Sequence, residues 1–222
     1  MSRPSKMFRN FGLSIALLLG LGAGAIGSLY SMKATIKVSE APLPLAPRRV
    51  DKNNTLGFPM MKNGDFDLID QNGQPRTSIN PNGEHQLIFF GYANCKAMCS
   101  VALPNLAKAV DLLEAMKLSV TPILITVDPE RDTVENLNKA ATDIHPKLVG
   151  LTGTQANLAI AYKTFNVEKK FLFNHIDEGP IYSHGSFLYL LGPKGDFKTI
   201  FAPIISPTKI AEISAGYITQ SR

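Results

Sequence analysis

Residues 86–99 read QLIFFGYANCKAMC, and this stretch decides what kind of fold the chain can have. Its first half, residues 86–92, is an apolar and aromatic run too short for a helix, which predicts a strand buried on both faces. Cys95 and Cys99 follow directly, and they are the two cysteines of the chain. Cysteines at the carboxyl end of a buried strand predict an α/β sheet with a ligand or redox site at that edge.

The segments after this stretch alternate between helix and strand patterns. They predict a helix over 100–117, a strand over 123–127, a helix from 132 to about 141, a strand over 148–151 and a helix over 155–165. Pro104 predicts that the first helix becomes regular near residues 100–103 or is kinked there. Asp132 and Glu135 resemble a capping box that would open the second helix.

Both ends of the domain carry hairpin signals. A strand pattern over 66–70 is followed by Asn72-Gly73, and strands over 187–191 and 197–201 are joined by the turn sequence GPKGD. Ser206-Pro207 then caps a last helix that runs to about Tyr217. This order of elements predicts a thioredoxin-like α/β fold with a mixed central sheet.

The N-terminal segment is a membrane-targeting signal. Three basic residues occur in residues 1–10, and the apolar run over 11–30 has about the 20 residues that a membrane-spanning helix needs. We expect a cytoplasmic N-terminus (1–10), a transmembrane anchor (11–30), a Pro-rich linker (31–63) and an exported thioredoxin-like domain (64–222). A cleaved signal peptide is the alternative, because Ala23-Gly24-Ala25 is an acceptable processing site, and either form exports the domain.

The charge distribution excludes a strongly basic nucleic-acid surface. The formal net charge is +5, but three of these charges belong to Arg3, Lys6 and Arg9. Only two net positive charges remain for the rest of the chain, and lysine and arginine do not alternate with aromatic residues in any run. We therefore expect no nucleic acid as a partner, whereas the N-terminal segment predicts a membrane.

Cys95 and Cys99 are the residues best suited to carry chemistry. If the segment is helical, positions four apart lie on one face about 5–6 Å apart, close enough for two sulfurs to share a metal. Two thiolates select Cu(I) or zinc, and three intervening residues are one more than a redox pair normally has. The N-terminus of a helix also stabilises a thiolate. The cysteine pair is therefore compatible with disulfide exchange as well as with metal binding.

His184 is the candidate for a third, nitrogen ligand, which would let the site hold both Cu(I) and Cu(II). It lies directly before the strand over 187–191, and in a thioredoxin-like sheet the loop entering that strand faces the cysteine turn. A lone histidine before a strand is more often structural. His85, His145 and His175 are expected to have surface or capping roles.

Three motifs, taken in order, resemble the Sco/SenC family of membrane-anchored copper proteins with a thioredoxin-like fold. They are GYANCKAMC at 91–99, TVDPERDT at 126–133, and YSH at 182–184 before an apolar strand and Gly192-Pro193. The resemblance implies that Cys95, Cys99 and His184 bind copper. It also implies a copper chaperone for the binuclear copper centre of cytochrome c oxidase subunit II or another copper-receiving protein, or alternatively a thiol-disulfide reductase acting on that subunit's cysteines.

We expect the chain in a bacterial inner membrane, single-pass, with its C-terminal domain in the periplasm. Lys96 and Ser100 stand where the family usually has proline, and Ser183 stands where it often has aspartate. Asp128 and Asp132 would orient the site from outside the ligand set, or Asp132 would cap a helix while Arg131 makes a surface ion pair.

Overall fold

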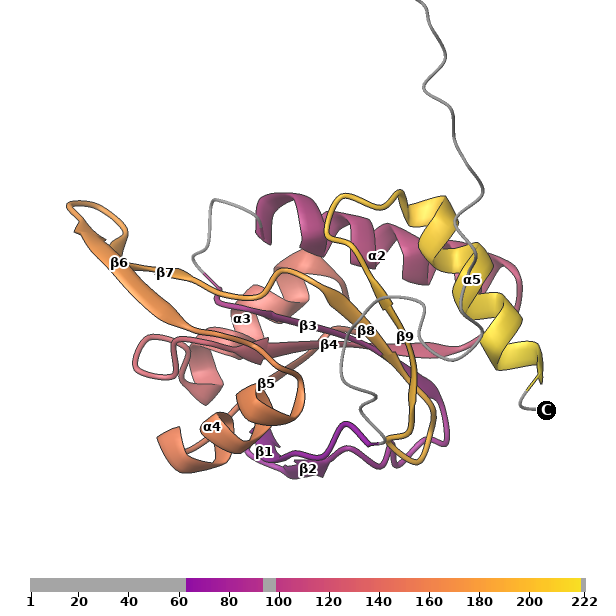
Figure 1. The fold of residues 1–222 in the computed structure, drawn as a ribbon, viewed down its shortest axis with the longest axis horizontal. Coiled ribbons are helices and arrows are strands. Elements are labelled where there is room, and N and C mark those ends of the chain that lie inside the picture. Colours follow the sequence, from indigo (N-terminus) through magenta and orange to yellow (C-terminus); the bar gives the residue numbers. More distant parts are fainter. Residues whose placement is uncertain (1–62, 94–98, 221–222) are drawn as a thin grey trace, which may run out of the picture. The chain divides into compact units, whose positions relative to one another are not determined.

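The computed structural model describes residues 63–93 and 99–220, apart from the side chain of Cys99 (Figure 1). The predicted anchor over 11–30, nearly all of the linker and Cys95 lie outside these residues. Within the described part, no helix combines the length and the apolar character needed to cross a membrane.

A seven-stranded mixed sheet forms the centre of the domain, in the order β2-β1-β5-β4-β3-β8-β9. The strands are β1 (Asp67–Asp70), β2 (Pro75–Thr77), β3 (His85–Gly91), β4 (Val120–Thr126), β5 (Val149–Thr152), β8 (Leu188–Leu191) and β9 (Phe197–Phe201). β3 pairs in parallel with β4, and β4 with β5, whereas the outer pairings are antiparallel. The predicted mixed sheet is confirmed.

Four helices cover the two faces of this sheet: α2 (Cys99–Ala115), α3 (Val134–Ile144), α4 (Gln155–Thr164) and α5 (Pro207–Gln220) (Figure 1). Leu87 and Phe89 of β3 pack in the core cluster that includes residues of α2, α3 and α5. Ile88 and Phe90 point to the opposite face and pack in the cluster that includes residues of α4. Each of these side chains is fully buried, which stabilises the fold by about 1.5–3 kcal/mol per side chain.

The start of α2 lies close to its predicted place. The helix begins at Cys99, one residue before the predicted range, so that Pro104 falls in its second turn. A proline there removes only the amide that would pair with the carbonyl of Ser100, near the helix start. The carboxyl end of β3 and the start of α2 are thus separated by the seven residues 92–98.

Both predicted hairpin turns are confirmed. Gly73 adopts a φ of +75° between β1 and β2, and Gly195 adopts a φ of +81° between β8 and β9. This left-handed backbone is open to glycine because glycine has no Cβ.

A second, two-stranded sheet projects from the domain, and the sequence patterns did not predict its strands. It consists of β6 (Lys170–His175) and β7 (Gly179–Ser183), and it extends to the left in Figure 1. Its large apolar side chains Phe171, Leu172 and Phe173 are exposed. Because β7 ends at Ser183, this hairpin leads directly into His184.

Candidate metal centre

The two predicted sulfur ligands lie outside the described part of the structure. Cys95 lies outside the described residues, and so does the side chain of Cys99, although Cys99 begins α2. The described neighbours on either side are Ala93, two residues before Cys95, and Ser100 in α2. They place the ends of the cysteine segment at the carboxyl edge of β3 and at the amino end of α2.

His184 lies against the strand that leads to the cysteines. Its ring packs edge-on against Phe89 of β3 and against Tyr92, with 6.0 Å between ring centroids in both cases. Nδ1 lies 3.1 Å from the carbonyl oxygen of Gly185. In the tautomer with a proton on Nδ1, this nitrogen donates to the carbonyl.

The pairing of β3 with β8 explains this contact. The two strands are antiparallel, with Phe89 opposite Leu188, so the start of β8 lies at the carboxyl end of β3. His184 precedes Leu188 by four residues, and Tyr92 follows Phe89 by three. The loop before β8 therefore lies beside Phe89 and Tyr92, whereas the cysteine turn that it is expected to face lies outside the described residues.

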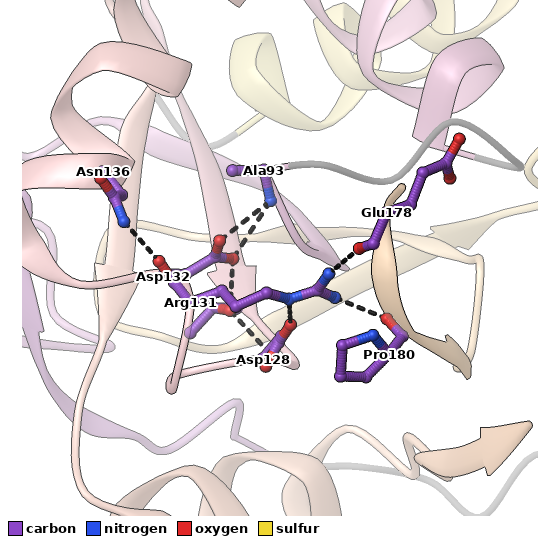
Figure 2. Close-up of polar contacts among 8 residues, drawn as sticks. Ala93, Asp128, Arg131, Asp132, Asn136, Glu178 and Pro180 are labelled. Carbon is purple, nitrogen blue, oxygen red and sulfur yellow. Dashed lines mark hydrogen bonds and ion pairs between the residues drawn. The ribbon is translucent and has the colours of Figure 1, made fainter. Parts of the chain in front are cut away.

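Asp132 does not cap a helix, and this expectation was wrong. The N-cap of α3 is Thr133, whose hydroxyl accepts a hydrogen bond from the amide of Asn136. Asp132 is 1% exposed and instead accepts hydrogen bonds from the amide of Ala93, at 3.1 Å, and from the hydroxyl of Thr126, at 2.6 Å (Figure 2). Its carboxylate therefore fixes the backbone just before the cysteine segment.

The environment of Asp132 disfavours its charged form. Burial raises the pKa of the carboxyl above its ordinary value of 3.8, and the hydrogen bonds from Thr126 and Ala93 offset this rise only in part. Asp128 raises the pKa further, since it brings a second carboxylate close by. Tyr162 donates its hydroxyl to the carbonyl of Thr126 at 2.8 Å, and burial raises the pKa of this phenol as well.

Arg131 is not a surface ion pair, as had been the alternative expectation. Its Nε donates to the carboxylate of Asp128, which is 1% exposed, and its two terminal nitrogens donate to the carbonyls of Glu178 and Pro180 (Figure 2). The guanidinium also lies over the ring of Tyr92, 5.3 Å from its centroid. Arg131 thus joins the turn after β4 to the β6–β7 hairpin.

The other three histidines lie away from this arrangement. His85 is in β3 and only 4% exposed, so a surface role was wrong for it, and burial lowers its pKa. His145 is the C-cap of α3, which confirms a capping role for it. His175 is exposed in β6, which confirms a surface role, and its Nδ1 accepts the amides of Asp177 and Glu178 in the β6–β7 turn. Over 63–93 and 99–220, no group of three or more His, Cys, Asp or Glu side chains is arranged to hold a metal.

Ala93 also borders two hollows in the surface. One is lined by residues of α2, including Ser100, Pro104 and Lys108, and the other by residues of α3, including Asn136 and Lys139. The backbone that leads into the cysteine segment is therefore open to solvent on the sides of α2 and α3.

The sequence of the chain is similar to those of known proteins. The sequence model of the family SCO1/SenC matches residues 55–219. The chain belongs to the SCO1/SenC family. A SCO2-like protein of Rickettsia felis is 33% identical over 204 residues, which cover 91% of this chain and 93% of the relative.

Solved structures of SCO1/SenC proteins share the fold. Copper-bound ScoI of Arabidopsis thaliana is 28% identical, has a TM-score of 0.66, and the match covers 71% of this chain and 98% of that one. BsSco, described as a member of the Sco family of cytochrome c oxidase assembly proteins with a disulfide switch, is 26% identical with a TM-score of 0.54, covering 71% and 95%. The thioredoxin-like fold with a mixed central sheet is confirmed, and copper is present in solved Sco structures.

Sequence patterns did not indicate the parts that Tyr92 and Arg131 take in this SCO1/SenC site. Tyr92 comes directly after a strand that is buried on both faces, at the edge of the sheet where a site was expected. This position could have indicated that Tyr92 contacts the site. Arg131 gave no such signal, because its partners are backbone carbonyls 47 and 49 residues further along the chain.

Proposed function

We propose that this chain is a membrane-anchored copper chaperone that binds copper through Cys95, Cys99 and His184 and serves assembly of the binuclear copper centre of cytochrome c oxidase. The observation that carries the proposal is the packing of the His184 ring against Tyr92, three residues before Cys95. The copper in ScoI of Arabidopsis thaliana and the family of BsSco support it.

The two cysteine sulfurs and the histidine nitrogen suit copper as the ion that is carried. Two thiolates suit Cu(I), and the added imidazole suits Cu(II), so the same three residues can hold the ion in both oxidation states. His184 is partly buried between aromatic rings, which restricts the orientation of its ring. The hydrogen bond that the amide of Ala93 donates to Asp132 restricts the backbone that leads to the first cysteine.

Copper titration of the full chain, purified in detergent, tests the ligand set. We expect saturation at about one equivalent of Cu(I) without oxygen, loss of tight binding in Cys95→Ser and Cys99→Ser, and weakened Cu(II) binding in His184→Ala. His145→Ala is the matched control, because the ring of this histidine contacts Asp111 and Lys147, which belong to neither the cysteine segment nor the β6–β7 hairpin. Unchanged Cu(I) affinity in Cys95→Ser would end the proposal.

Delivery to the oxidase needs a test in cells. A strain without this chain should lose oxidase activity, regain it with the wild-type gene, and fail to regain it with Cys99→Ser. The anchor over 11–30, the linker over 31–63 and the periplasmic location are part of the same proposal. Protease added to spheroplasts should therefore digest the domain over 64–222 without lysis.

A thiol-disulfide reductase is the second candidate, favoured by the disulfide switch described for BsSco and by the position of Cys99 as the first residue of α2. In that reaction one thiolate attacks a disulfide of the partner to give a mixed disulfide. The second thiolate then releases the partner with two thiols and leaves a Cys95–Cys99 disulfide. Restoration of oxidase activity by His184→Ala would favour this function over copper transfer.

A further inference from the structure

Arg131 makes more contacts to other elements than a surface arginine would. All three nitrogens of its guanidinium donate hydrogen bonds: Nε to Asp128, one terminal nitrogen to the carbonyl of Glu178, and the other to the carbonyl of Pro180 at 2.6 Å (Figure 2). The guanidinium carbon also lies over the ring of Tyr92, 5.3 Å from its centroid. A planar, five-donor group is the side chain suited to such a set of partners.

These partners belong to two parts of the molecule that adjoin His184. Glu178 and Pro180 flank the first residue of β7, the strand that ends one residue before His184. Tyr92 forms one of the aromatic surfaces against which the His184 ring packs. Arg131 therefore fixes both the strand that carries the histidine and the ring that supports it.

The structure is arranged to admit this side chain. Asp128 is buried and its own amide donates to the hydroxyl of Thr126 at 2.8 Å, which fixes the carboxylate that orients Arg131. Gly179 has a φ of +69°, and a Cβ placed there would lie 3.1 Å from a terminal nitrogen of Arg131. A glycine at this point of β7 permits the close approach of the guanidinium.

We propose that Arg131 is a positioning residue that holds His184 beside the cysteine segment and so determines how well the protein retains Cu(II) compared with Cu(I). The inference rests on the proposed copper site. Two thiolates are sufficient for Cu(I), whereas retention of Cu(II) depends on the imidazole. Displacement of β7 and Tyr92 therefore weakens Cu(II) binding selectively.

Arg131→Lys is the informative variant. Lysine keeps a positive charge beside Asp128, but an ammonium on a flexible stem cannot reproduce the planar fork that reaches two carbonyls and covers Tyr92. In the full chain, we expect Cu(II) affinity to fall about tenfold, while Cu(I) affinity changes less than about threefold. Lys209→Ala is the control, because it removes an exposed positive charge paired with Glu212 on α5.

A double-mutant cycle separates positioning from general support of the fold. If Arg131 acts through the imidazole, Arg131→Lys produces no further loss of Cu(II) affinity in a His184→Ala background. Equal losses in both backgrounds, or parallel losses of Cu(I) and Cu(II), overturn the inference. If Arg131→Lys does not fold, Gly179→Ala tests the same contact without changing Arg131, and the same selective loss of Cu(II) is expected.

A measurement on the metal-free protein keeps this inference separate from the copper proposal. In nuclear magnetic resonance spectra, the ring protons of His184 should show contacts to Tyr92 in the wild type and lose them in Arg131→Lys. Retained contacts overturn the positioning role even if copper binds as proposed. Lost contacts support it even if the wild type proves not to bind copper, a result that would refute only the proposed function.

Discussion

Removal of the Asp132 carboxylate tests how the backbone before Cys95 is held. Asp132→Ala takes the acceptor away from the amide of Ala93 and from the hydroxyl of Thr126. A buried donor without its acceptor costs about 1–3 kcal/mol, while removal of a buried carboxylate relieves part of its desolvation. We therefore expect the free energy of unfolding to fall by about 2 kcal/mol.

The pH dependence gives a sharper test with the isosteric variant Asp132→Asn. Burial raises the pKa of Asp132 above 3.8 in the folded state, so the folded chain keeps this proton to higher pH than the unfolded chain. The folded state then binds more protons in this window, and this contribution to stability falls as pH rises through it. The stability advantage of the wild type over Asp132→Asn should therefore be largest below about pH 4 and decrease as the pH rises above that value.

Denaturant unfolding, followed by tyrosine fluorescence, measures both effects, because the chain contains six tyrosines and no tryptophan. Thr126→Val is the companion variant, since it removes one of the two donors and should reduce the effect of Asp132→Ala when both are combined. An advantage of the wild type that grows with pH would refute the reasoning. It would mean that the folded state stabilises the ionised carboxylate, with a lowered pKa.

Two other expectations concern the scaffold. Gly195→Ala should lower the free energy of unfolding by about 1–3 kcal/mol, because the residue has a φ of +81° and a Cβ would lie 2.7 Å from the hydroxyl oxygen of Ser78. Gly216→Ala should raise it by about 0.5–1 kcal/mol, because Gly216 lies in α5 and a Cβ there would meet nothing within 4 Å. Thermal unfolding of the two variants checks the opposite signs, and a shift in the same direction would contradict the expectation. Burial raises the pKa of Tyr189 to about 12, so the folded state keeps this proton longer and loses stability as pH rises from 10 toward that value. Tyr189→Phe should remove this loss and one late step in an absorbance titration of the phenols, and an unchanged titration would contradict the assignment.

The sheet was predictable because its signals are local. The apolar run before the cysteines could only be a strand buried on both faces, and the structure buries every residue of β3. The turns at Gly73 and Gly195 were likewise predictable, since their backbone favours glycine. The β6–β7 hairpin was missed because its apolar residues do not alternate and its ring contact, Phe171 with Tyr182, joins distant positions.

The role of Asp132 could not be predicted for a different reason. Asp132 and Thr133 are neighbours, and both residue types cap helices well. Sequence alone does not decide which one faces α3. The decision comes from the amide of Ala93, which lies 39 residues earlier in the chain and is brought next to Asp132 by the pairing of β3 with β4.

The consecutive residues Arg131 and Asp132 connect the two halves of the proposed copper site. Asp132 faces the backbone before Cys95, and Arg131 faces the strand before His184 (Figure 2). Both belong to one turn that is fixed by Thr126, whose hydroxyl donates to Asp132 and accepts from the amide of Asp128. A displacement of this turn therefore moves the supports of the sulfur segment and of the imidazole together. For this reason a variant at Thr126 should change Cu(I) and Cu(II) retention together, whereas a variant at Arg131 should separate them.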